Sequence, residues 1–344
     1  MEHKTRIKGN VHYVGVNDRN KHRFEGMWPL PYGVSYNSYL IDDEMVALVD
    51  TVDICYFEVY LRKIKQVIGE RPINYLIINH MEPDHSGSIR LIKQHYPEII
   101  IVGNKQTFGM IEGFYGVTGE QYLVKEGDFL ALGHHKLRFY MTPMVHWPET
   151  MMTFDETDGV LFSGDGFGCF GTVDGGFLDT RINVDKYWGE MVRYYSNIVG
   201  KYGSPVQKAL QKLGGLPISA ICSTHGPVWT ENIAKVIGIY DRLSRYDADE
   251  GVVIAYGSMY GNTEQMAEAI AEELSAQGVK NIVMHNVTKS HPSYILADIF
   301  RYKGLIIGSP TYSNQIFPEV EALLSKILLR EVKGRYLGYF GSFT

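Results

Sequence analysis

Apolar and polar positions along residues 1–248 alternate in short runs that predict strands with helices between them. Residues 34–41 and 45–50 predict two paired strands around the turn Asp42-Asp43, and residues 57–68 show helical periodicity. Further strands are expected at 74–79, 98–102, 136–141, 151–154, 160–163 and 220–223, and further helices at 87–96, 184–198 and 205–213. This order predicts a mixed sheet with interleaved helices, in which several strands end where a His or an Asp appears.

A second pattern begins after the polar break at residues 247–251. A strand at 252–256 is followed by a Gly-rich loop, a helix at 263–277, a strand at 282–286, a helix around 294–300 and a strand at 305–308. Strands and helices that alternate with short loops are typical of a doubly wound parallel α/β domain. The sequence therefore predicts two domains, 1–248 and 249–344, and 344 residues are too many for one ordinary core.

Composition and charge exclude several classes of protein. The formal net charge is −6 and the Lys and Arg residues are scattered, so neither nucleic acid nor an anionic membrane is an expected partner. No apolar run approaches the roughly 20 residues of a membrane span, and residues 1–6 lack the apolar stretch of a secretory signal. Cys55, Cys169 and Cys222 form no C-x-x-C pair and are expected to be reduced thiols, with Cys222 packed as a small apolar side chain. A cytoplasmic location is therefore expected.

The strongest chemical signal is the segment His80-Met81-Glu82-Pro83-Asp84-His85, directly after the strand at 74–79. Three later residues, His146, Asp165 and His225, each follow a predicted strand as well. Because ligands usually bind at strand ends in α/β folds, these seven side chains are candidates for a metal site. The alternative is that they are surface or hydrogen-bonded core residues, which is the interpretation adopted for Asn79, His134 and His135.

This ordered set resembles the metallo-β-lactamase superfamily, whose signature is H-x-H-x-D-H followed by His, Asp and His. Glu82 replaces the second His here, which is the pattern of flavodiiron proteins. The resemblance implies an αββα sandwich that holds two irons. One iron would take His80, Glu82 and His146, the other Asp84, His85 and His225, with Asp165 bridging, and whether His85 coordinates is left open. Imidazoles and carboxylates without thiolates suit iron; a zinc-dependent hydrolase on the same residues is the alternative.

The loop from Ser258 to Thr263 lies between a predicted strand and a helix, where backbone N–H groups can bind a phosphate. Ser258, Gly261 and Thr263 resemble the T/S-x-T-G-x-T phosphate loop of flavodoxins, and a second segment at 310–315 resembles the flavodoxin segment beside the isoalloxazine ring. The residues that this resemblance assigns to FMN are Ser258, Met259, Tyr260, Gly261, Asn262, Thr263, Pro310, Thr311, Tyr312, Ser313 and Asn314.

The flavodoxin pattern would continue with a third flavin loop, a strand and a helix. The sequence ends at residues 339–344, where that third loop would begin. We therefore expect the flavodoxin-like domain to be C-terminally truncated, and a domain that lacks an edge strand is the alternative.

The resemblance also implies a function. Flavodiiron proteins reduce dioxygen to water or nitric oxide to nitrous oxide with electrons from FMN, as head-to-tail homodimers or tetramers in which one subunit's flavin faces the other's irons.

The resemblance also implies roles for three aromatic residues. Trp147 is expected on the path between flavin and metal, and Tyr194 or Tyr195 near the substrate, with simple packing as the alternative for all three. Since the sequence has no rubredoxin-like Cys pairs, a separate rubredoxin, a reductase or reduced deazaflavin would supply electrons. A flavodoxin-like electron carrier with an N-terminal docking scaffold is a further alternative, and the preferred gas is left open.

Overall fold

The computed structural model describes residues 5–343, which pack into two compact units. The first comprises the chain up to Met191 together with Pro205–Gly238, and the second comprises Val192–Ser204 and the chain from Ile239 onward. By packing, residues 192–204 and 239–248 thus group with the second unit. The division into domains at residue 249 stays a prediction.

Two sheets form the centre of the first unit. Seven strands make the first sheet, in the order β1 (Arg6–Lys8), β2 (Val11–Tyr13), β7 (Tyr39–Ile41), β8 (Ala47–Val49), β9 (Tyr75–Ile77), β10 (Ile100–Gly103) and β11 (Gln121–Leu123). Five strands make the second, in the order β12 (Phe129–Ala131), β13 (Lys136–Met141), β14 (Met151–Asp155), β15 (Val160–Gly164) and β16 (Ala220–Ser223). Two short ribbons pair β3 (Val16–Asp18) with β6 (Val34–Tyr36) and β4 (Arg23–Phe24) with β5 (Trp28–Pro29).

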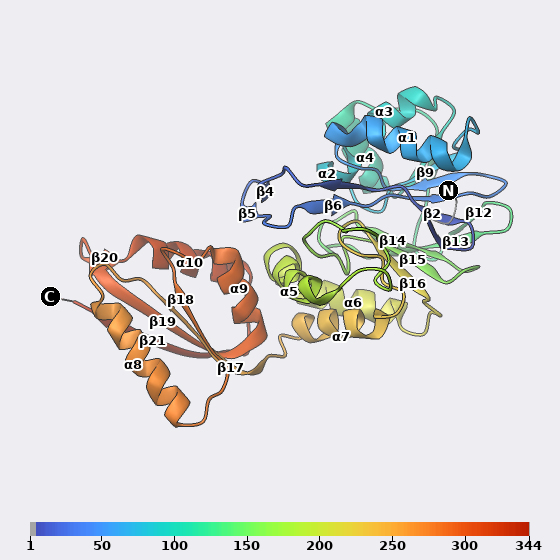
Figure 1. Cartoon of the computed structure of the whole chain (residues 1–344). Coiled ribbons are helices and arrows are strands. Elements are labelled where there is room, and N and C mark those ends of the chain that lie inside the picture. The colour runs from blue at the N-terminus through green and yellow to red at the C-terminus, as the bar shows by residue number, and fades with distance from the viewer. Residues whose placement is uncertain (1–4, 344) are drawn as a thin grey trace. The chain divides into compact units, whose positions relative to one another are not determined.

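Helices cover the outer faces of the two sheets, which gives the expected αββα sandwich (Figure 1). The helices up to residue 244 are η2 (Ile54–Tyr56), α1 (Phe57–Ile68), α2 (Pro83–Ser86), α3 (Ile89–His95), α4 (Lys105–Tyr115), α5 (Asp185–Tyr194), η3 (Tyr195–Val199), η4 (Gly200–Tyr202), α6 (Gly203–Leu213) and α7 (Ile233–Ser244). In α1, the buried residues Phe57, Leu61 and Ile64 recur at helical spacing, so one face of the helix packs against the sheet.

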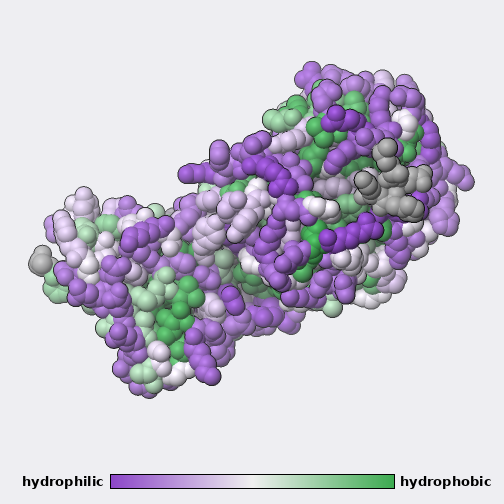
Figure 2. All heavy atoms as spheres, in the orientation of Figure 1, coloured by the Kyte–Doolittle hydropathy of each residue, from purple (hydrophilic) through white to green (hydrophobic). Residues whose placement is uncertain are grey.

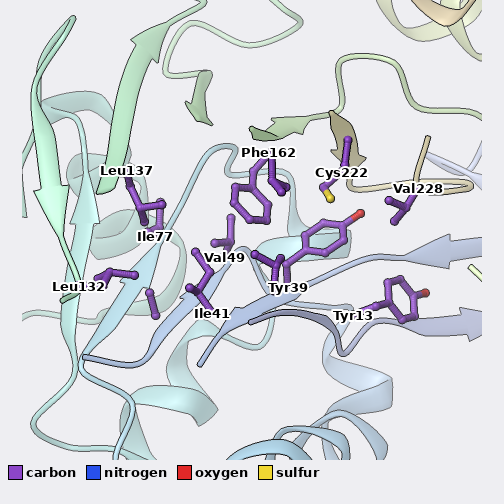
Figure 3. Packing of buried hydrophobic residues seen from close by; sticks show 14 of the residues in the cluster. Tyr13, Tyr39, Ile41, Val49, Ile77, Leu132, Leu137, Phe162, Cys222 and Val228 are labelled. Carbon is purple, nitrogen blue, oxygen red and sulfur yellow. The ribbon is translucent and has the colours of Figure 1, made fainter. Parts of the chain in front are cut away.

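The apolar faces of the two sheets pack against each other. Figure 3 shows Tyr39 and Phe162 pointing toward one another from the two sheets, and their ring centres are 5.5 Å apart. Cys222 lies in the same core, and all three cysteines are free thiols, as predicted. This packing fixes the positions of the strand ends of the two sheets relative to each other, and the site described below lies at those strand ends.

The strand predicted at 34–41 is divided into two strands, β6 and β7. The sequence pattern predicts a continuous strand at 34–41, but β6 ends at Tyr36 and pairs with β3, whereas β7 begins at Tyr39 and pairs with β8. The chain breaks at Asn37 and Ser38. The Asn37 amide donates to the backbone carbonyl of Ser223, outside both ladders, and the Ser38 hydroxyl donates to that of Val49, at the end of β8. The pairing of the 45–50 strand with its predecessor is confirmed through β7 and β8.

The second unit contains the doubly wound parallel sheet that the sequence predicts. Its strands run in the order β18 (Ile282–Asn286), β17 (Asp249–Tyr256) and β19 (Tyr302–Tyr312), with β21 (Tyr336–Ser342) parallel to β19 and β20 (Gln315–Ile316) antiparallel to its end. Its helices are α8 (Asn262–Ala276), α9 (Pro292–Arg301) and α10 (Pro318–Leu329). Figure 1 shows α8 on one face of this sheet and α9 and α10 on the other.

Hydrophilic residues cover most of the surface in view, and apolar patches on it are small (Figure 2). Among residues 5–343, the helices are too short or too polar for any of them to cross a bilayer.

Candidate metal centre and flavin loops

The seven candidate ligands converge at one edge of the sandwich of the first unit. The first sheet supplies four of them: His80 and Glu82 follow β9, and Asp84 and His85 lie in α2. The second sheet supplies the rest, since His146 lies between β13 and β14, Asp165 follows β15 and His225 follows β16. Each of the seven is at most 8% exposed. Buried charges are costly unless they are paired or bind a metal, so this concentration of acids and imidazoles indicates a cation site.

Asp165 stands between two pairs of imidazoles. Its Oδ2 lies 3.0 Å from Nε2 of His146 and 3.7 Å from Nε2 of His80. Its Oδ1 lies 3.1 Å from Nε2 of His85 and 3.6 Å from Nε2 of His225. The two oxygens of a single carboxylate therefore face two separate sets of ligands.

Each set also contains its own carboxylate. Glu82 Oε2 lies 3.2 Å from Nε2 of His146 and 3.8 Å from Nε2 of His80. Asp84 Oδ2 lies 3.4 Å from Nε2 of His225, and its Oδ1 lies 3.7 Å from Nε2 of His85. The cluster is thus two groups of two imidazoles and one carboxylate that share Asp165.

Several of these buried atoms lack the hydrogen bonds that buried polar atoms normally make. Nε2 of His80, Nε2 of His85 and both carboxylate oxygens of Asp84 have no hydrogen-bond partner among residues 5–343. Buried polar groups without partners are rare in folded proteins, and an ion is one accepted reason for them. The donor set, four imidazoles and three carboxylates without a thiolate, fits two iron ions better than a structural zinc.

Glu149 contacts a candidate ligand, His80, and the sequence interpretation missed it. Its Oε1 lies 2.7 Å from Nδ1 of His80 and accepts a hydrogen bond of 2.9 Å from the backbone N–H of Met81. Metal-binding imidazoles commonly donate their second N–H to a carboxylate, which fixes the ring orientation. The signal available in the sequence was an acidic residue in the same loop as His146.

The loop that carries His225 is anchored by Ser35 in β6 and by Asn37, which follows β6. Nδ1 of His225 lies 2.8 Å from the carbonyl oxygen of Ser35, and the Asn37 amide donates to the carbonyls of Ser223 and Gly226. Gly226 has φ +81°, and a Cβ there would lie 2.2 Å from Sγ of Cys169. Only glycine therefore fits this tight turn.

Hydrogen bonds and charges within the cluster shift several pKa values. Burial alone would raise the pKa of Glu82, but the hydrogen bond with His146 and the nearby imidazole of His80 lower it to about 2. Burial raises the pKa of Asp84 to about 6, and the charge of Glu82 adds to this rise. Burial would lower the pKa values of His85 and His146, but the carboxylates around them, Asp165 first, raise both to about 9. A cation would therefore displace protons on binding.

A cavity of about 490 Å³ opens next to the cluster. Glu82 and Asp84 line its inner end, and Lys21, Arg90 and Phe114 are among its other lining residues. This volume lies in the range of small-molecule sites. The cavity therefore reaches one residue of each ligand group, Glu82 and Asp84.

Trp147, which the sequence interpretation placed on the electron path, contacts the cluster directly. Its ring centre is 5.2 Å from that of His80, edge to face, and 6.1 Å from that of His146. Tyr194 is fully buried. Tyr195 packs on Tyr240 and Phe300 within the second unit. The catalytic roles of Trp147 and Tyr194 stay predictions.

His135 has the structural role expected of it. Its Nδ1 lies 2.9 Å from Oδ2 of Asp155, and both side chains are buried. Asp158 completes a third small group of possible ligands, but the carboxylate of Asp155 already bonds the imidazole. Asn79 is also a core residue, because its N–H groups donate to Asp50 and its side-chain oxygen accepts from Thr153.

The first flavin loop in the second unit has the geometry of an anion site. Gly261 has φ +92° and precedes α8, a helix of 15 residues, and its N–H donates to Oγ of Ser258 at 3.2 Å. The first N–H groups of a helix have no intrahelical acceptors and point out of its end. Thr263 is buried there, with Oγ1 2.9 Å from Oγ of Ser342 on β21. Tyr260 is 91% exposed. This loop fits a phosphate, and Ser342 is a neighbour that the sequence interpretation missed.

The second flavin segment, predicted as a loop at 310–315, is a β-hairpin. β19 extends through Tyr312 and pairs with β20 across a two-residue turn. Ser313 and Asn314 adopt left-handed conformations, φ +48° and +59°, which match a tight hairpin turn. Tyr312 is 49% exposed beside this turn. Of the third loop expected at 339–344, residues up to Ser342 form β21, and Thr344 lies outside the described residues.

Two protein families match the chain in separate segments. The family described as "ODP family beta lactamase" matches residues 34–226, and the flavodoxin family matches residues 254–343. Curated relatives include the anaerobic nitric oxide reductase flavorubredoxins of Vibrio vulnificus (strain YJ016), 33% identical, and Escherichia coli O1:K1 / APEC, 31% identical. Each match covers 98% of this chain, and 69% and 71% of the respective relatives.

Solved structures give the same result at the level of the fold. The rubredoxin oxygen:oxidoreductase of Desulfovibrio gigas superposes with a TM-score of 0.94 at 32% identity, over 98% of this chain and 85% of that one. The flavodiiron protein of Giardia intestinalis superposes with a TM-score of 0.93 at 28% identity, over 97% of this chain and 82% of that one. Both comparisons span both units of the chain.

Proposed function

Since this chain belongs to the flavodiiron protein family, we propose that it reduces dioxygen to water, or nitric oxide to nitrous oxide, at two iron ions that receive electrons through FMN. The observation that carries this proposal is the position of Asp165, whose two oxygens face two separate groups of imidazoles. A shared carboxylate is suited to two ions close together, and paired ions commonly lie roughly 3.5–4 Å apart. One small substrate can then contact both.

Side chains of this chain would bind the two ions and orient the carboxylate that the ions share. His80, Glu82 and His146 would hold one ion, and Asp84, His85 and His225 the other. When bound, ferrous ions and reduced FMN would together supply four electrons, which dioxygen needs to become water, or the two that a pair of nitric oxide molecules needs. Thr224 Oγ1 donates a hydrogen bond to Oδ1 of Asp165 and fixes the orientation of this carboxylate.

The burial of the ligands and the cavity beside them define how a substrate would reach this site. The ligand side chains are sequestered from bulk water, which strengthens electrostatic interactions within the cluster. The cavity beside Glu82 and Asp84 gives a diatomic gas a direct route to them. Nothing in these ligands distinguishes dioxygen from nitric oxide, so the proposal includes both gases.

Turnover of the two gases tests this function. The iron- and FMN-loaded chain, supplied with a reduced rubredoxin or another reduced donor, is expected to consume dioxygen or nitric oxide at a gas electrode. Parallel assays with the two gases identify the preferred substrate. If the fully loaded chain consumes neither gas with any donor, the proposal is wrong.

We propose that FMN binds at the loop before α8 and beside the β19–β20 hairpin. Thr263→Ala is expected to weaken FMN binding about tenfold or more, because a hydrogen bond to a charged group contributes about 1.5–3 kcal/mol. The flavin-to-protein ratio after gel filtration and a fluorescence titration measure this loss. Thr288→Ala is the matched control, since its hydroxyl bonds only locally, to Asn286, in an exposed turn. Equal FMN affinity in the two variants would contradict the assignment.

A zinc-dependent hydrolase on the same seven ligands is the competing function. Glu82 in place of an imidazole and the flavodoxin match at residues 254–343 both argue against it. A yellow protein that contains iron by plasma emission favours the reductase, whereas a colourless zinc protein favours the hydrolase.

We further propose that a head-to-tail homodimer brings the flavin of one subunit to the irons of the other, which sedimentation of the purified protein can test.

A further inference from the structure

The two proposed metal positions differ in the hydrogen-bond partners of the imidazole Nδ1 atoms, the ring nitrogens that point away from the ions. At the position of His80, Glu82 and His146, a carboxylate backs His80, because Glu149 Oε1 lies 2.7 Å from its Nδ1. Glu149 is fully buried. The backbone N–H of Met81 donates to its carboxylate at 2.9 Å, and Nδ2 of Asn104 donates to its backbone carbonyl oxygen, so both the side chain and the backbone of Glu149 are held in place. Asn104 is itself held as the N-cap of α4.

The position of Asp84, His85 and His225 has weaker support. His225 is backed by a neutral group, the carbonyl oxygen of Ser35, at 2.8 Å. Nδ1 of His85 is buried and has no hydrogen-bond partner among the residues that the structure describes. An imidazole backed by an anion is a stronger electron donor than one backed by a carbonyl, and its ring is also fixed in orientation.

We infer that Glu149 is a positioning residue that makes the two iron positions unequal. It holds His80 with Nε2 toward the ion and strengthens this ligand. The iron at His80, Glu82 and His146 is therefore bound more tightly, and is harder to reduce, than the iron at Asp84, His85 and His225. This inference rests on the proposed di-iron function but concerns binding rather than turnover.

A chelator competition on the iron-loaded, full-length chain tests the inequality. Under anaerobic conditions the wild type is expected to release its ferrous ions in two steps as chelator concentration rises. Glu149→Gln keeps the shape of the side chain and removes its charge, and is expected to weaken the tighter step about 10- to 100-fold while leaving the weaker step in place. Glu149→Leu also removes the hydrogen bond and is expected to weaken the tighter step further.

Asp155→Asn is the matched control. It alters another buried carboxylate that bonds an imidazole, His135, in the same unit but outside the cluster. Any general loss of folding stability appears in both variants, whereas only the Glu149 variants should change iron release. Electron paramagnetic resonance during a redox titration adds a second readout. Glu149→Gln is expected to raise the reduction potential of one iron, whereas Asp155→Asn is expected to leave the reduction potentials of both irons unchanged.

Release of both irons in a single step by the wild type would overturn the inference. The inference would also be overturned if Glu149→Gln weakened iron binding equally in both steps, weakened it only in the looser step, or released iron as the wild type does. Two unequal steps in a chain that consumes neither gas would refute the proposed function and leave this inference standing. A loaded chain that holds fewer than two irons would refute both.

Discussion

Asp165→Ala is expected to lose both metal ions and all reductase activity. The substitution removes an oxygen from each ligand group, since Oδ2 faces His146 and Oδ1 faces His85. It also leaves four closely spaced imidazoles with less negative charge around them. Iron content by plasma emission should fall below about one tenth of the wild-type value, because loss of even an outer partner weakens metal affinity about 10- to 100-fold.

Asp155→Asn again separates a lost ligand from a destabilised fold. The carboxylate of Asp155 is as buried as that of Asp165 but bonds His135 instead of the cluster. The folded fraction of this control should retain its iron. An Asp165→Ala protein with a full iron complement would show that Asp165 is not shared between two ions.

Metal affinity is expected to rise steeply with pH. In the ion-free chain, the pKa values of His85 and His146 are raised to about 9, so both imidazoles are protonated at neutral pH. An ion binds only the neutral imidazole, and its binding therefore releases these protons. Affinity should increase about tenfold per pH unit for each proton released. The increase should begin at neutral pH and continue through about 9, and His80 adds to it, because the carboxylates around it, Glu149 first, hold its pKa well above the ordinary value although burial would lower it.

Proton release can be counted directly with an indicator dye during metal addition. Asp84, with a pKa of about 6, should add a further proton only in acid. His85→Ala is expected to reduce the number of protons released by about one, because it deletes one of the titrating ligands. An affinity that stays constant between neutral pH and 9 would contradict the raised pKa values.

Regular periodic segments were predictable from the sequence. The helix at 57–68 and the strands at 136–141, 220–223 and 282–286 have the predicted bounds, because each is marked in the sequence by helical spacing of apolar residues or by a short apolar run. The short ribbons of the first 33 residues carried no such signal, since β4 and β5 have only two residues each. The helix predicted at 184–198 continues past Tyr194 as the π-helical segment η3, a change of hydrogen bonding that periodicity does not reveal.

The seven candidate ligands could be named from the sequence because their residue types occur in the fixed order of a family motif, and the structure brings them together. Their supporting residues could not be named, because such partners come from distant segments. Glu149 reaches His80 across 69 positions, and the carbonyl of Ser35 reaches His225 across 190. A backbone carbonyl carries no residue signature, and a single acidic residue resembles any other until the fold is known.

The division of the ligands between the two sheets has a consequence for how the protein is made. The first sheet, with His80, Glu82, Asp84 and His85, is complete in sequence by residue 123, whereas His225 follows the last strand of the second. A ribosome that synthesises the chain from its N-terminus delivers the final ligand only after more than a hundred further residues. The full set of proposed metal ligands therefore exists only after His225 has been synthesised, so the nascent chain cannot hold both ions while only the first sheet has been made.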